Sequence, residues 1–240
     1  MQLDLQRPHG AGELLSMTFA FFRAHATALF TMTLIVVAPA AILIDGIWGR
    51  ALAEGATAKL PVGATVASVA VGALIQTPIV AALAAASVTA AVRGEELHVG
   101  AAFRAAAPRI LPAIAAVTLA AVAIFAGFLL LVVPGIYLAV RLYLSAQASV
   151  LDRLSPVAAL RRSGELVEGE WWATLGRLLL AGLAFGLIAI AGQAVGAALG
   201  NGALYVTAVV IAQAVAGSLA AIFGTLLFFD LRARKETQPA

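Results

Sequence analysis

The chain has 240 residues, of which 62% are hydrophobic and only 11% charged, and its mean hydropathy is +1.02. A soluble domain carries roughly a quarter charged residues, so this composition excludes an ordinary soluble domain and indicates a protein surrounded by lipid. The net charge of +3 does not indicate nucleic-acid binding, because basic residues gather in the cytoplasmic loops of membrane proteins. The absence of cysteine excludes disulfides and thiolate metal sites.

Six apolar segments reach or approach the length of about 20 residues that is needed to cross a bilayer. We therefore predict an all-α membrane protein with a single domain over residues 1–240 and six transmembrane helices in three hairpins. The predicted spans are residues 26–48, 64–92, 110–133, 136–151, 172–199 and 204–231. Pro134-Gly135 is predicted to end the third helical span, since proline lacks the N–H donor and glycine permits a reversal of the chain.

A short amphipathic segment with basic residues precedes each predicted hairpin, at residues 12–25, 98–109 and 155–171. Apolar side chains recur in them at spacings of three and four, which places these side chains on one helical stripe. The third segment opens with Ser155-Pro156, a typical helix start. The pattern favours three interfacial helices on anionic lipid over plain connecting loops.

The basic residues indicate the orientation, because cytoplasmic loops are enriched in arginine and lysine. Only Arg50 and Lys59 fall on the side predicted to face outward. We therefore predict both termini in the cytoplasm, with Tyr137 near the outer interface and Trp171 near the inner one. High alanine, glycine and valine with more arginine than lysine is typical of a high-GC bacterial genome, so the membrane predicted is the bacterial inner membrane. The residues on the cytoplasmic side are Arg7, Arg23, Arg93, Arg104, Arg109, Arg153, Arg161, Arg162, Arg177, Arg232, Arg234 and Lys235.

Arg141 is the outstanding polar residue, since an ionisable side chain inside a span is a functional hypothesis by default. The alternative is a structural arginine that reaches the outer surface along its own stem or pairs with Asp45. Gln76, Gln147 and Gln193 are large polar groups in other predicted spans. Together these residues form a candidate polar site in the membrane, although such groups more often hydrogen-bond neighbouring helices.

Glycines at a spacing of four predict close packing of the last two spans, because small residues let helix backbones approach each other. Gly192, Gly196 and Gly200 form two overlapping pairs of this kind, and Gly182 with Gly186 forms another. A partner within the chain is favoured over a second copy of the protein.

Residues 132–180, VVPGIYLAVRLYLSAQASVLDRLSPVAALRRSGELVEGEWWATLGRLLL, resemble the membrane domain of some glycerophosphoryl diester phosphodiesterases and of related uncharacterised bacterial inner-membrane proteins. GELLSMTFAFFRAH, VGAAFRAAAPR and LLFFDLRARKE fit the same pattern. The resemblance implies a multi-pass membrane domain, and these 240 residues hold no counterpart of the phosphodiesterase catalytic domain. Proteins that consist of this membrane domain alone are, as the resemblance implies, mostly without an assigned activity.

No catalytic motif is found: the three histidines have no HExxH spacing, and G-x-S-x-G and P-loop patterns are absent. We therefore expect a protein without catalysis, cofactor or metal, acting as a scaffold, lipid-interacting protein or accessory subunit. Its expected partners are membrane lipids, which are anionic at the cytoplasmic face. The sequence does not identify a protein partner. The alternative is a transporter of a small solute or lipid, with Arg141, Gln76 and Gln147 pointing into a common cavity. A membrane enzyme is the third hypothesis.

Overall fold

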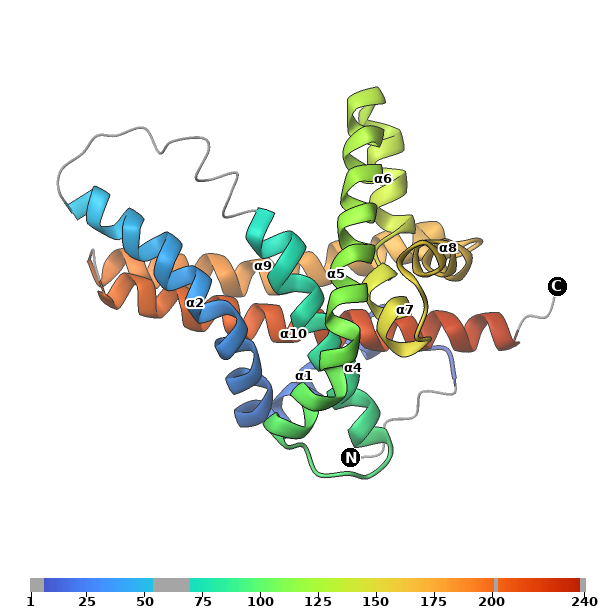
Figure 1. Ribbon diagram of the computed structural model, residues 1–240, viewed down its shortest axis with the longest axis horizontal. Helices are drawn as coiled ribbons and strands as arrows, with labels where there is room; N and C mark the ends of the chain where they lie inside the picture. Colours follow the sequence, from blue (N-terminus) through green and yellow to red (C-terminus); the bar gives the residue numbers. More distant parts are fainter. Residues whose placement is uncertain (1–6, 54–69, 201–202, 238–240) are drawn as a thin grey trace.

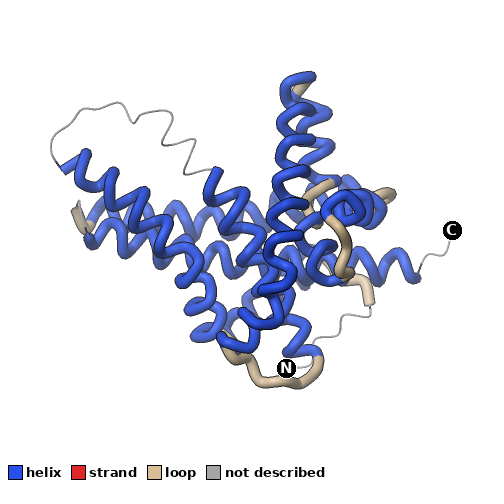
Figure 2. Tube along the Cα trace, in the orientation of Figure 1, coloured by secondary structure: helices blue, strands red, loops and turns tan. Residues whose placement is uncertain are grey.

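The computed structural model describes residues 7–53, 70–200 and 203–237, with the backbone alone described for residues 40–53 (Figure 1). All regular structure in this part of the chain is helical (Figure 2). Four of the described helices are long and apolar enough to cross a membrane, and a pair bent by 91° near His25 makes a fifth candidate. The predicted helical class is confirmed.

From η1 to α9, consecutive helices are joined by few residues. In Figure 1, α5 and α6 form a hairpin that stands across α9 and α10, which lie side by side. The helices in chain order are α1 (Ala11–Ala24), α2 (Ala26–Ala53), the π-helical turn η1 (Gly72–Gln76), α4 (Thr77–Val92), α5 (Val99–Leu130), α6 (Val132–Arg141), α7 (Ser145–Leu151), α8 (Pro156–Val167), α9 (Trp171–Ala198) and α10 (Ala203–Thr237).

Helix α10 lies at the centre of the fold, with α1, α2, α4 and α9 packed around it. Between Ser218 and Ala233 its buried side chains cover every face of the helix, including Phe223 and Phe228, which are almost completely enclosed. A helix that is apolar all round is one that is buried on all sides. A packed helix, and not a cavity, therefore occupies the middle of the molecule.

Two of the three predicted amphipathic segments form separate short helices. Helix α1 buries Leu14, Thr18 and Phe21, which follow one another at spacings of four and three. Helix α8 begins after Ser155, with Pro156 in its first turn, as the sequence predicts. Each of these helices keeps one buried stripe and one polar side, which is the pattern from which they were predicted.

The prediction of a separate helix over residues 98–109 is wrong, because this segment is the first part of the continuous helix α5. The buried small residues of α5 run along one stripe through both parts of the helix. Pro108 and Pro112 lie within the helix but do not end it. A stripe that continues unbroken gives the chain no reason to turn. Its members are Ala102, Ala106, Ala113, Ala116, Ala120 and Gly127.

The predicted break at Pro134-Gly135 is also misplaced, since the chain reverses at Leu131, whose backbone is extended, and α6 begins at Val132. Proline near the start of a helix costs little, because the first N–H groups of a helix have no intrahelical partner. Gly135 serves close packing: a Cβ there would overlap the ring of Phe128 on α5.

The predicted fourth span, residues 136–151, is not one straight helix but α6 and α7, separated by three residues. Helix α8 packs at this break. The hydroxyl of Ser163 donates to the Arg141 carbonyl (2.8 Å) and accepts from the Leu144 N–H (3.1 Å). One side chain thus satisfies two backbone groups that the interrupted helix leaves free.

A contact between α6 and the start of α9 contradicts the prediction that Tyr137 and Trp171 lie at opposite interfaces of the membrane. The rings of Tyr137 and Trp171 stack with their centroids 5.8 Å apart, and the Trp171 indole N–H donates to the Tyr137 carbonyl (3.2 Å). Both residues therefore lie at one level. The prediction failed because it assumed a straight fourth span, whereas the chain folds α8 and the start of α9 back onto α6.

The small residues of α9 divide into two groups. A Cβ at Gly192 would overlap that of Ala212 on α10, and a Cβ at Gly196 would lie 3.0 Å from the Tyr205 ring. These two glycines allow the close approach of α9 to α10. Gly182 and Gly186 have open space beside them, as does Gly200, whose φ of +92° suits the turn that follows α9.

Gly196→Leu should lower the free energy of unfolding by about 1–3 kcal/mol, because the added side chain meets both the ring and the backbone of Tyr205. Gly182→Leu on the same helix is the matched control and should leave stability unchanged or slightly raised, since leucine favours the helix. Thermal melting in detergent measures both. Equal melting of the two variants would contradict this packing.

Candidate functional site

Arg141 is held by its immediate neighbours. Its guanidinium donates to the Tyr137 hydroxyl one turn earlier (2.7 Å) and lies 5.8 Å from the centre of that ring. Its stem packs on helix α8, where a Cβ at Gly164 would lie 2.9 Å from its Nε. The side chain thus lies between α6 and α8, and among the described residues its hydrogen bond is to Tyr137 and not to a glutamine of the predicted polar site.

The glutamines of the predicted polar site face three different surroundings. Gln76, at the end of η1, lies 3.5 Å from the Val37 carbonyl of α2. Gln147 is buried against Gly224 of α10, and its side-chain oxygen has no hydrogen-bond partner among the described residues. Gln193 is exposed. The side chain of Asp45 lies outside the described part, and the other four residues do not meet in one site.

The charged residues gather instead around Asp230, near the end of α10. Its side chain is completely buried, and one oxygen accepts the His9 backbone N–H (2.5 Å). The other oxygen accepts from Arg234 Nε (2.9 Å) and forms an ion pair with Arg177 of α9 (3.4 Å). Arg234 also donates to the His9 carbonyl (2.8 Å). Two side chains one turn apart on α10 therefore hold both backbone groups of His9. We call these four residues the Asp230 cluster.

A second carboxylate joins the α7–α8 connection to the same end of α10. Asp152 accepts from Arg162 (3.0 Å) and from Arg232 (3.2 Å). Lys235 adds a bond to the Glu168 carbonyl beyond α8 (2.8 Å). The N-terminal segment, α7, α8 and α9 are thus all tied to the last turns of α10 by charged groups.

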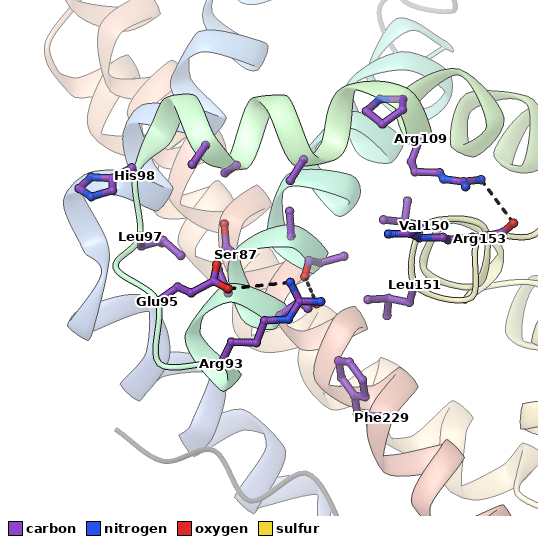
Figure 3. Close-up of a pocket in the computed structure, with 18 of the residues that line it drawn as sticks. Ser87, Arg93, Glu95, Leu97, His98, Arg109, Val150, Leu151, Arg153 and Phe229 are labelled. Carbon is purple, nitrogen blue, oxygen red and sulfur yellow. Dashed lines mark hydrogen bonds and ion pairs between the residues drawn. The ribbon is translucent and has the colours of Figure 1, made fainter.

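Beside this network is a cavity of about 620 Å³ (Figure 3). It lies where the end of α4, the first turns of α5, the end of α7 and the end of α10 meet. Small residues of α4 and α5 form much of its lining, and Val150, Leu151 and Phe229 add an apolar side. Its polar lining residues are Ser87, Thr89, Arg93, Glu95, Glu96, His98, Arg109, Arg153 and Arg232.

The four arginines of the cavity differ in how far they are neutralised. Arg232 forms ion pairs with Asp152 and with Glu236. Arg93 lies 3.9 Å from Glu95 with both side chains largely exposed, an arrangement that contributes little. Arg109 donates to the Arg153 carbonyl (3.3 Å). In Figure 3, Arg93 and Arg153 enter the cavity from opposite sides.

Arg109 and Arg153 have no ion pair with a carboxylate among the described residues. Guanidinium groups without a carboxylate partner attract an anion, and their planar fork matches the oxygens of a carboxylate or a phosphate. The arrangement is therefore a candidate anion-binding site. We call it the arginine cavity.

Sequence reasoning treated these arginines only as markers of orientation. Their convergence depends on how four helix ends are brought together, and no local spacing reports that. The Asp230 cluster did leave a local signal, since Asp230 and Arg234 are separated by four residues and a carboxylate followed by arginine at this spacing pairs on a helix. Arg177, inside an apolar run, was a second signal.

Asp230→Asn should lower the free energy of unfolding by about 3–5 kcal/mol, because it leaves the buried Arg177 cation with only the longer contact to Glu170 (3.9 Å). Glu236→Gln removes an exposed carboxylate from the same helix and should change stability by less than about 1 kcal/mol. Chemical unfolding in detergent compares the two. Similar losses would show that Asp230 is no more important than a surface charge.

Comparisons with known proteins find no match to this chain: no family model, no curated protein and no solved structure is similar to it. The resemblance of residues 132–180 to the phosphodiesterase membrane domain therefore stays a prediction from the sequence. Any function for this chain rests on the geometry of its own side chains.

Proposed function

We propose that the protein is a multi-pass protein of the bacterial inner membrane, with both termini in the cytoplasm, that acts without catalysis as a lipid-interacting scaffold or accessory subunit. In this proposal the long apolar helices α4, α5, α9 and α10 are embedded in the bilayer, with α9 and α10 crossing it side by side. Helices α6 and α7 pack against α5, and each is too short to cross the bilayer alone.

The observation that carries the proposal is the meeting of helix ends at the arginine cavity. The end of α4, the start of α5, the end of α7 and the end of α10 are the four places where the sequence puts cytoplasmic ends of spans. Arg93, Arg109, Arg153 and Arg232 come from these four places. Positive charge concentrated at one end of a set of apolar helices is the pattern of a cytoplasmic face.

The opposite end of the α5–α6 hairpin supports the proposal from the other side. Its tip is apolar and unprotected, with Leu130 77% exposed and Val133 76% exposed. Helix α9 likewise exposes Leu179, Leu183 and Ile190. Apolar patches of this kind make a soluble protein prone to aggregation, whereas a bilayer accommodates them.

A scaffold or lipid-interacting role is favoured over the transporter because α10 fills the middle of the molecule. The residues proposed to line a transport pathway, Arg141, Gln76 and Gln147, contact different neighbours. The resemblance to membrane domains without assigned activity points in the same direction.

Accessibility of single cysteines tests the topology, and the chain offers a clean background because it contains no cysteine. Glu96→Cys and Ala240→Cys should react with a membrane-impermeant maleimide only after the inner membrane is opened. Thr57→Cys should react from the periplasm in intact spheroplasts. Labelling of Ala240→Cys from outside, or recovery of the protein in the soluble fraction after alkaline washing, would contradict the proposal.

A further inference from the structure

We propose that the arginine cavity binds a phosphate monoester group, of the kind found on a phosphatidic-acid-type headgroup. This inference rests on the proposed function, which places the cavity at the cytoplasmic surface of the membrane. Basic pockets between helices at that surface are suited to anionic headgroups.

The first argument is the charge left over inside the site. Among the described residues, Arg109 and Arg153 have no carboxylate partner, and Arg93 has only a long and exposed contact with Glu95. The other carboxylate of the lining, Glu96, lies 3.5 Å from His98. A phosphate monoester offers three oxygens and up to two negative charges, so it can accept paired N–H donors from more than one guanidinium. A carboxylate offers only two oxygens, and three arginines exceed what it can use.

The second argument is the shape and lining of the space. A volume of about 620 Å³ is within the roughly 300–1,000 Å³ of small-molecule sites and far larger than a single phosphate ion requires. Val150, Leu151 and Phe229 add apolar side chains to the lining. This combination suits a ligand with a charged head and an apolar remainder.

The third argument is the backbone of Arg153, whose φ is +53°. Among the described residues it is the one non-glycine residue in this left-handed region, at the position just after the end of α7 where glycine is usual. This backbone conformation directs the Arg153 carbonyl to Arg109, while the side chain enters the cavity (Figure 3). Strain of this kind is characteristic of ligand clamps.

The experiment compares the native protein with Arg109→Gln, Arg153→Gly and Arg104→Gln, each reconstituted into phosphatidylcholine nanodiscs. Arg104 lies on α5, five residues before Arg109 and outside the lining, so it controls for the loss of one positive charge on that helix. Arg153→Gly removes the side chain and at the same time relieves the strained backbone. Its melting temperature should therefore be unchanged or raised while its binding is lost, which separates a binding defect from unfolding.

Binding is measured with two probes. Phosphatidic acid is added to the nanodisc lipid and its retention is followed by native mass spectrometry, and glycerol 3-phosphate is titrated by calorimetry. Arg109→Gln and Arg153→Gly should each weaken binding by about ten- to a hundredfold, the effect of losing a hydrogen bond between charged groups. Arg104→Gln should change it by less than about twofold. Binding of phosphatidic acid alone identifies a lipid ligand, and binding of glycerol 3-phosphate identifies a soluble one.

The proposal is overturned if neither probe binds the native protein, or if Arg109→Gln and Arg153→Gly bind as well as Arg104→Gln. These outcomes leave the proposed function intact as long as the protein enters the nanodiscs and its cysteine variants report the expected topology. Failure to insert would instead contradict the proposed function itself.

Discussion

A carboxylate withdrawn completely from water must be matched by cations and N–H donors, and this requirement at Asp230 organises one whole end of the molecule. The residue accepts from Arg234 and the His9 backbone, and it pairs with Arg177. Three segments distant in the sequence are thereby held together. Arg177 and Asp230 can meet only where α9 and α10 are packed side by side. The Asp230 cluster therefore couples the docking of the N-terminal segment to the pairing of these two helices.

The arginine cavity is a consequence of the same arrangement. Arg232, two residues after Asp230, is held by Asp152 and so fixes the end of α7 against α10. This contact places Arg153 opposite Arg93 with the cavity between them (Figure 3). Arginines are expected at the cytoplasmic ends of membrane spans. Some of them, such as Arg232, are neutralised here by ion pairs, and others, such as Arg153, remain available to bind an anion.

The sequence predicted well those features that depend on local pattern. The predicted span 172–199 is helix α9, and the helix start at Ser155-Pro156 is where the structure has it, because periodicity and capping are properties of neighbouring residues. The break between α6 and α7 could not be predicted. It depends on Ser163, a residue about twenty positions away, which satisfies the freed backbone groups. The arginine cavity was missed for the same reason, since its members meet only through tertiary packing, whereas the emphasis on Arg141 rested on its position in an apolar run.

The most direct test of this account is a double-mutant cycle between Asp230 and Arg177. The free energies of unfolding in bicelles are measured for Asp230→Asn, for Arg177→Met, for the variant with both changes and for the native protein. The account predicts that the two changes together cost less than the sum of their separate costs, with a coupling of about 1–3 kcal/mol. Each single change leaves the other buried group short of one charged partner, Arg177 with only Glu170 and Asp230 with only Arg234, and the second change removes that group. Additive costs would mean that the pair does not hold this end of the molecule together, and would contradict the central role given to Asp230.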